Sequence, residues 1–302
     1  MKKIILLLFF LQAGIVFSHP GSGILVDKKG NIYFTYTGVG VGRISNDGAL
    51  TYIYKSVEGH WLCLDAEGIF SQLQPKYFKR ITEDGVKPAL IFAGGGSPVT
   101  MGNDGNFYYC GSGNADFNPG AMTIIRETQQ HNLTVLSPQL EDVLKNLHDG
   151  ITGLAADASG LYVACWNSLL RVNMKGDVKV LVHPVNVPGC DEDPADHKED
   201  NRGIPLLRGI ATDRGGNVYV AATSCHCLIM VTPDGKVKTV LTSDRPWSPT
   251  GVTVDSDDIY VLEYTNANGP KTEGWKPRIR KIDKDGNITV VLDLSKDGNK
   301  VK

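Results

Sequence analysis

A few residues of this sequence could bind metal or transfer protons. His60 and His148 are metal candidates, because neutral imidazole binds zinc or copper and also shuttles protons near neutral pH. Glu263 and His60 are the candidates for acid–base catalysis. Arg208 would hold an anion, since a guanidinium grips a carboxylate through two parallel hydrogen bonds. These residues lie far apart along the chain, so only the fold can bring them together.

Aromatic and amide residues would complete a ligand-binding site. Trp166 and Tyr264 are expected to form stacking walls around a ligand. The expected ligand-binding residues are Arg208, Trp166, Asn167, Tyr264, Trp247 and Asn266. For each of them the alternative stays open that it is an ordinary polar or aromatic rim residue, which bonds to water and to its neighbours.

The first 18 residues have the pattern of an export signal. Two lysines precede an apolar stretch that ends at Phe17, and Val16 and Ser18 occupy the −3 and −1 positions of a cleavage site. We expect residues 1–18 to be removed and the protein to be periplasmic or secreted. An uncleaved membrane anchor is the alternative, although the apolar run is short for one. Cleavage after Ser18 would make His19 the first residue of the mature chain, where its amine and ring could chelate copper together with a second histidine.

A repeat runs through the chain and supplies the elements that would position these residues. Six segments join two strands through an acidic or Gly-rich turn, and each second strand starts near an aromatic residue. The segments are VDKKGNIYF, LDAEGIF, MGNDGNFYY, ADASGLYV, TDRGGNVYV and VDSDDIYV, with aromatic anchors Tyr33, Phe70, Tyr108, Tyr162, Tyr219 and Tyr260. A third strand, a turn that is mostly Asp-Gly and a fourth strand follow, because Gly accepts the positive φ of hairpin turns.

Six units of four short antiparallel strands predict an all-β protein, a six-bladed β-propeller. A four-stranded sheet covers both of its faces only between two neighbours in a ring. Two β-sandwiches are the alternative, but sandwiches do not repeat one turn pattern six times. One domain is expected over residues 19–302, with a short helix at 139–147. Its blades span roughly 19–56, 57–96, 97–147, 148–187, 204–243 and 247–295, with an acidic loop insertion at 183–205.

The strings SPTGVTVDSDDIYVLEY and LLRGIATDRGGNVYVAAT resemble NHL repeats. They are also similar to the six-bladed propellers of the gluconolactonase, senescence-marker and strictosidine-synthase-like superfamily, and the chain looks like an exported bacterial member. The resemblance covers nearly all of residues 19–295 and rests on blade-forming residues, so it implies a fold rather than an activity.

The resemblance also implies where family residues would lie. Lactonase-type members hold a divalent ion with a glutamate on the first inner strand, where this sequence has Ser22. A strictosidine-synthase-like role would need a glutamate at the channel. Glu263 is the comparable residue, but it belongs to a different blade and strand. The His-rich rim is similar in residue type to the zinc-using amidating-lyase propellers.

In such propellers the first strand of each blade lines the channel. The position before the Gly that these strands share reads Ser22, His60, Ser97, Thr152, Arg208 and Thr250. We therefore expect His60 and Arg208 at the channel mouth, with His19 and His148 on the same rim. The ends of the second strands are expected to bring Trp166 and Glu263 to this face.

Six cysteines are compatible with disulfides in an exported protein. A disulfide from Cys190 to Cys225 or Cys227 would fasten the acidic insertion to its blade. A zinc site formed by these cysteines and His226 is the alternative, although Cys-x-Cys lacks the usual ligand spacing. The insertion itself is expected to be a solvated acidic lid, with calcium binding as its alternative. The remaining cysteines are expected to be buried thiols: Cys63, Cys110 and Cys165.

Composition limits the partners. With 41% hydrophobic and 21% charged residues the chain can bury a core, and its formal net charge of −2 offers no electrostatic basis for nucleic-acid binding. After the first twenty positions no apolar run reaches the length of a membrane span. A monomer is expected.

These observations predict an exported β-propeller that binds a small molecule, a peptide or a protein at the loop-rich mouth of its central channel. The alternative is an enzyme, either a metal-assisted hydrolase of the lactonase kind or a lyase, that uses the rim His and Glu residues. Its cofactor would be one divalent ion, calcium or zinc. A converging set of His or carboxylate ligands with an open position would favour the enzyme.

Overall fold

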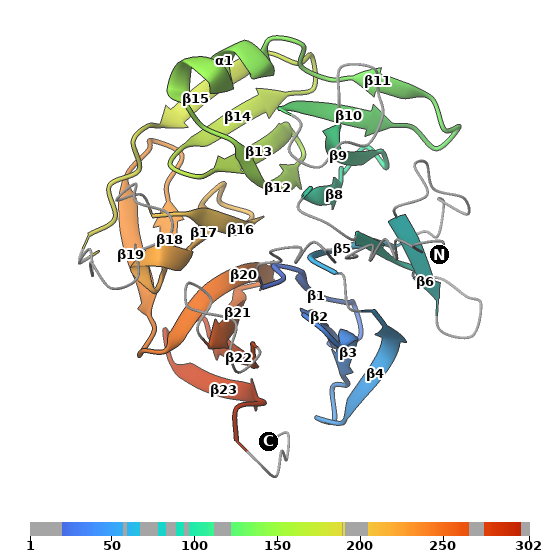
Figure 1. Cartoon of the computed structure of the whole chain (residues 1–302), viewed down its shortest axis with the longest axis vertical. Coiled ribbons are helices and arrows are strands. Elements are labelled where there is room, and N and C mark those ends of the chain that lie inside the picture. Colours follow the sequence, from blue (N-terminus) through green and yellow to red (C-terminus); the bar gives the residue numbers. More distant parts are fainter. Residues whose placement is uncertain are drawn as a thin grey trace, which may run out of the picture.

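The computed structural model is a six-bladed β-propeller, as the repeats predict (Figure 1). It describes residues 20–56, 59–66, 78–82, 89–93, 97–111, 122–188, 190, 205–265 and 275–296. Helix α1 (Leu140–Leu147) lies between blades 3 and 4, where the sequence predicts it, and a short 3-10 helix, η1, spans Thr223–Cys225. In the described part of the chain, no helix combines the length and the apolarity that a membrane span needs.

Five blades are antiparallel sheets with four strands in chain order. Blade 1 contains β1 (Ile24–Val26), β2 (Ile32–Tyr36), β3 (Gly40–Ile44) and β4 (Leu50–Lys55). Blade 3 contains β8 (Val99–Met101), β9 (Phe107–Gly111), β10 (Thr123–Glu127) and β11 (Leu133–Val135). Blade 4 contains β12 (Ile151–Asp157), β13 (Gly160–Cys165), β14 (Leu169–Asn173) and β15 (Val178–Val182). Blade 5 contains β16 (Leu207–Thr212), β17 (Val218–Ala222), β18 (Cys227–Val231) and β19 (Val237–Thr242), and blade 6 contains β20 (Trp247–Asp255), β21 (Asp258–Thr265), β22 (Pro277–Ile282) and β23 (Ile288–Asp293).

Blade 2 departs from the expected strand order. Its described strands are β5 (Trp61–Asp65), β6 (Phe78–Thr82) and β7 (Ala89–Ala93), and they pair in the order β5-β7-β6. Strand β7 is buried from Leu90 to Ala93, which suits a central position, whereas β6 has an exposed Lys79, which suits an edge. Phe70, the expected aromatic anchor of this blade, lies outside the described residues.

The ring closes by packing of the first blade against the last. The inner strands β1, β5, β8, β12, β16 and β20 each contact the next, and β20 contacts β1 (Figure 1). The two chain ends contribute separate blades, because β1–β4 build blade 1 and β20–β23 build blade 6. Six clusters of buried apolar side chains fill the spaces between successive blades.

The inner strands approach one another so closely that glycine is required. A Cβ on Gly209 would lie 2.5 Å from the Cα of Gly251, and a Cβ on Gly251 would lie 2.4 Å from the carbonyl oxygen of Ser22. Both obstacles are backbone atoms, which cannot rotate away. The Gly shared by the repeats is therefore a consequence of ring closure.

A carboxylate stabilises the turn between the first and second strands. Asp27 accepts hydrogen bonds from the backbone and side-chain nitrogens of Asn31 at 2.9 and 2.8 Å, and from the Tyr33 hydroxyl at 3.1 Å. Burial raises the pKa of Asp27, but these hydrogen bonds to its charged form outweigh that effect and hold the pKa below its usual value. Blade 5 repeats the arrangement with Asp213, Asn217 and Tyr219. The aromatic anchor of the repeat is thus also a hydrogen-bond donor.

Blade 3 builds the same turn from a different position. Gly102 occupies the place of Asp27, and Asp104 supplies the carboxylate to Asn106 at 2.7 Å and to the Tyr108 hydroxyl at 2.7 Å. A Cβ on Gly102 would lie 2.4 Å from Oδ1 of Asp104. Gly102 therefore leaves the space that the shifted carboxylate fills.

Cys190 and Cys225 form a disulfide with a Cα–Cα distance of 4.9 Å, which confirms one of the two expected pairings. It fastens the segment after β15 to η1 of blade 5. Cys227 is a buried thiol, and burial raises its pKa to about 12. Cys63, Cys110 and Cys165 are buried thiols as expected. A disulfide persists in oxidising compartments, so this one is compatible with an exported protein.

We predict that Gly251→Ala destabilises the ring. The added methyl group meets the backbone of Ser22, so the free energy of unfolding in urea should fall by about 1–3 kcal/mol. Gly215→Ala is the matched control, because a Cβ there meets only side-chain atoms, the nearest at 3.2 Å. Equal stability of the two variants would contradict the account of ring closure.

We predict that the double variant Cys190→Ser, Cys225→Ser loses about 2–4 kcal/mol of unfolding free energy, because the unfolded chain is no longer crosslinked. Cys227→Ala should keep the disulfide, which peptide mapping under non-reducing conditions would show. A Cys190–Cys227 peptide in the unmodified protein would overturn the assignment.

Candidate functional site

Six polar residues stand at the start of the inner strands, one from each blade. They are Ser22, His60, Ser97, Thr152, Arg208 and Thr250, and all but the half-buried Thr152 are buried. In blades 4, 5 and 6 the pairing register shifts at this place, around Thr152, Arg208 and Thr250. Such β-bulges change the direction of a side chain at a strand end. The repeat therefore brings His60 and Arg208 to the same end of the channel.

The segment Pro20–Ser22 lies across this end of the channel. Hydrogen bonds join it to four blades, through Thr37 (2.8 Å), His60 (2.7 Å), Arg208 (3.5 Å) and Thr250 (2.8 Å). A three-residue segment reaches blades 1, 2, 5 and 6 together only near the axis. The chain itself thus narrows the channel mouth.

Three hydroxyl groups in this ring have no hydrogen-bond partner among the residues that the structure describes. They are Oγ of Ser22, Oγ of Ser97 and Oγ1 of Thr152, and each atom is buried. A buried polar group that stays unpaired costs about 1–3 kcal/mol, so such groups are rare without a reason. All three occupy the same position of the repeat, in blades 1, 3 and 4. Unpaired hydroxyls therefore recur at this position of the repeat in three blades.

Trp166 and Asn167 lie beside Arg208. The backbone nitrogen of Leu207 donates to the carbonyl oxygen of Trp166 at 3.1 Å, which joins the β13–β14 turn to the inner strand of blade 5. Asn167 donates its backbone N–H to Asp149 at 3.2 Å and is half-buried. The structure thus brings three of the expected ligand-binding residues to one corner of the rim.

A buried chain of polar groups supports this corner. Ser168 donates its hydroxyl to Asp149 at 2.5 Å, and Nδ1 of His183 donates to the Ser168 oxygen at 2.8 Å. Ser168 is fully buried and Asp149 is 4% exposed. His148, an expected metal ligand, is exposed next to Asp149, with the left-handed φ of 53° that ends α1. Sequence reasoning missed Asp149 and Ser168, because no motif marks them.

Glu263 is fully buried and held by internal cations. Its Oε2 accepts hydrogen bonds from Nε of Arg278 at 2.7 Å and Nε of Arg280 at 2.8 Å. Its Oε1 accepts from Nη2 of Arg280 at 2.6 Å and from the Ser243 hydroxyl. Both oxygens are therefore engaged within blade 6 and at its border with blade 5. The sequence signal for this cluster is the Arg-x-Arg of β22, in which Arg278 pairs directly across from Glu263 and Arg280 follows two residues later on the same face.

Trp247 and Tyr264 also serve blade packing in the structure. The guanidinium of Arg278 stacks 4.3 Å above the Trp247 ring. Arg278 also forms an ion pair with the exposed Asp244 at 3.0 Å. Burial raises the pKa of Asp244, but the contact with Arg278 outweighs it and lowers the pKa. The fully buried Tyr264 donates its hydroxyl to the carbonyl oxygen of Thr35 at 2.5 Å. That bond joins blade 6 to blade 1, and burial raises the pKa of Tyr264 to about 12.

The histidines of the described rim are not gathered into one group. His60 is buried against the Pro20–Ser22 segment, and His148 is exposed at the end of α1. Within the described ranges, no three His, Cys, Asp or Glu side chains form a group that could hold a metal ion. His19 and Asn266, and residues 191–204 of the acidic insertion, lie outside the described residues.

The comparisons with known proteins show the fold. No family profile matches the chain. No curated protein matches it either. Among solved structures, it is similar to the PQQ-bound aldose sugar dehydrogenase from Streptomyces coelicolor, with 12% identity over 87% of this chain and 94% of that chain, and a TM-score of 0.53.

Two further structures are similar to a comparable degree. A luciferin-regenerating enzyme has 13% identity over 90% of each chain, with a TM-score of 0.52. An auxiliary nutrient binding protein from Bacteroides thetaiotaomicron has 12% identity over 83% of this chain and 68% of that chain, with a TM-score of 0.50. At such identities the similarity concerns architecture alone. The comparisons therefore support the six-bladed β-propeller fold.

Proposed function

We propose that this protein is an exported binding propeller that recognises a small molecule, a peptide or a protein at the mouth of its central channel. The observation that supports it best is the set of unpaired buried hydroxyls of Ser22, Ser97 and Thr152. A ligand with hydrogen-bonding groups would satisfy them, and their repetition around the ring suits one ligand that several blades contact. Export is supported by the disulfide and by the signal pattern in residues 1–18.

The rest of the proposed site is the corner formed by Trp166, Asn167 and Arg208. The guanidinium of Arg208 would pair with a carboxylate or carbonyl group, and the half-buried indole of Trp166 would stack on a flat or apolar part of the ligand. The hydrogen bonds of Asp149 and of Leu207 hold this turn in place before any ligand arrives. Such preorganisation lowers the entropic cost of binding.

Binding is favoured over catalysis by the state of the expected catalytic carboxylate. An acid–base group needs an oxygen that can reach the substrate. Both oxygens of Glu263 are occupied by Arg278, Arg280 and Ser243, so this residue stabilises blade 6. The fold does not decide the question, because the similar structures include enzymes as well as a nutrient binding protein.

We predict that Arg208 contributes to the affinity for any ligand that a thermal-shift screen finds. The screen would contain amino acids, dipeptides, small carboxylates and sugars, and Arg208→Lys should weaken binding of a hit about tenfold because the two-pronged contact is lost. Arg214→Lys, an exposed residue in the β16–β17 turn, is the matched control. A dissociation constant that neither variant changes would place the binding site elsewhere.

We predict that the double variant Ser22→Ala, Ser97→Ala is at least as stable as the unmodified protein without ligand, because it removes two unpaired buried hydroxyls. Ser168→Ala should instead lose about 1–3 kcal/mol of unfolding free energy, since it breaks the bond to Asp149. Equal losses in both variants, measured by urea unfolding, would remove the main support for the proposal.

A further inference from the structure

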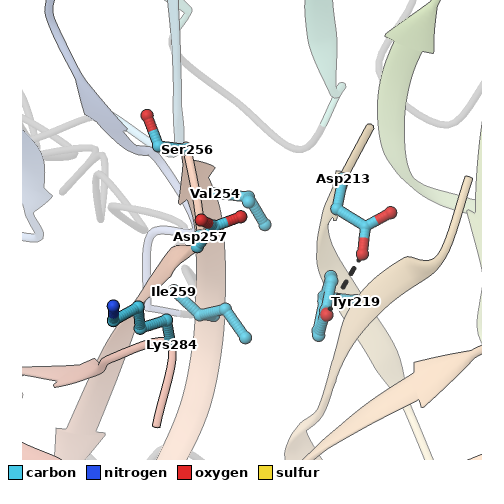
Figure 2. A pocket seen from close by; sticks show the side chains of 7 residues that line it. All are labelled: Asp213, Tyr219, Val254, Ser256, Asp257, Ile259 and Lys284. Atoms are coloured by element: carbon cyan, nitrogen blue, oxygen red, sulfur yellow. Dashed lines mark hydrogen bonds between the residues drawn. The ribbon is translucent and has the colours of Figure 1, made fainter. Parts of the chain in front are cut away.

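A pocket lies between blades 5 and 6, at the opposite end of the inner strands from the channel mouth. It is a pocket of about 270 Å³ between the β16–β17 turn and the β20–β21 turn (Figure 2). Tyr219 and Asp213 form one side, and Val254, Asp257 and Ile259 form the other. Its volume lies just below the range of drug-sized ligand pockets, so it suits a small ligand.

The tyrosine of this pocket differs from its equivalents in the other blades. In four blades the aromatic anchor on the second strand has a basic residue as its partner on the third strand. The pairs are Tyr33 with Arg43, Tyr108 with Arg126, Tyr162 with Arg171 and Tyr260 with Lys281. In blade 5 the partner of Tyr219 is Met230. Blade 5 therefore keeps the aromatic ring and has replaced the cation with an apolar side chain.

The contacts in blades 4 and 6 show what that cation does. In blade 4 the guanidinium of Arg171 lies 3.9 Å from the centre of the Tyr162 ring and forms an ion pair with Asp157. In blade 6 the ammonium of Lys281 lies 5.6 Å from the centre of the Tyr260 ring and 2.5 Å from Asp258. The repeat thus uses a ring and a carboxylate together to hold a positive charge.

Blade 5 retains both partners of such a charge. Tyr219 is 9% exposed and donates its hydroxyl to Asp213 at 3.3 Å. Burial and the Asp213 charge raise the pKa of Tyr219, so its hydroxyl stays protonated and the ring stays neutral. Asp257 stands across the pocket at the tip of the β20–β21 turn (Figure 2). Among the described residues, neither Asp213 nor Asp257 forms an ion pair.

We propose that this pocket binds a small organic ammonium ion. The ammonium group would lie beside the Tyr219 ring with Asp213 and Asp257 as counter-charges, the same combination of ring and carboxylate that holds the Arg171 side chain within blade 4. Its apolar part would contact Val254 and Ile259. Lys284 also lines the pocket, but its ammonium lies on the far side of Ile259 from Tyr219 (Figure 2), so it weakens binding without blocking it. The site is independent of the channel mouth.

The test is a titration of the purified protein with three probes of one shape. Isobutylammonium, isobutanol and isobutyrate are a cation, a neutral molecule and an anion, and binding is followed by the methyl NMR signals of Val254 and Ile259. We expect saturable shifts with isobutylammonium alone. Asp257→Asn should weaken this binding roughly threefold or more, and Lys284→Ala should strengthen it, because each changes one charge at the pocket.

The variant Met230→Arg tests the ammonium site without changing any residue that lines the pocket. The new guanidinium would stack on Tyr219 and pair with Asp213, as in blade 4, and should abolish isobutylammonium binding while thermal stability is kept or raised. Asp142→Asn, an exposed carboxylate on α1 between blades 3 and 4, is the control and should change nothing. Unaltered binding in Met230→Arg, preferred binding of isobutyrate, or no shift with any probe would overturn the proposal.

Discussion

The close approach of the six inner strands is the constraint on which this structure depends. Between blades 4 and 5, 5 and 6, and 6 and 1 the strands meet backbone to backbone, at Gly153, Gly209 and Gly251. Ring closure needs such contact because no strand is exchanged between the chain ends among the described residues. The position before each of these glycines lies at the end of the channel, so its side chain belongs to the proposed binding site.

Two kinds of buried polar group result from this arrangement. Glu263 is fully paired, and its bonds to Arg278 and Arg280 offset the cost of burying charge. Ser22 and Ser97 are buried in the ring of inner strands and have no partner within the described part of the chain. A paired cluster stabilises a blade, whereas an unpaired group leaves bonding capacity for a ligand. That contrast separates structural residues from candidate binding residues here.

Differences between equivalent blade positions carry the remaining information. In blade 3, Asp104 lies two residues after the position that Asp27 has in blade 1, yet it forms the same hydrogen bond with the tyrosine of its blade. Met230, in contrast, replaces a basic residue without compensation and leaves the Tyr219 ring next to a pocket. Repeated blades can be compared with one another within a single chain. A blade that lacks a residue type found at the same position in the other blades, with no substitute for its contact, therefore points to a local function.

The sequence by itself determined the six units, the helix at 139–147 and the restriction of Cys190 to two partners, because turns, strand periodicity and cysteine spacing are local. Tertiary structure decided between Cys225 and Cys227, placed β7 in the middle of blade 2, and paired Glu263 with Arg278 and Arg280. These outcomes depend on register and on packing between distant segments. A sequence pattern names the polar residues of a propeller rim, but only the folded ring shows which of them already have partners.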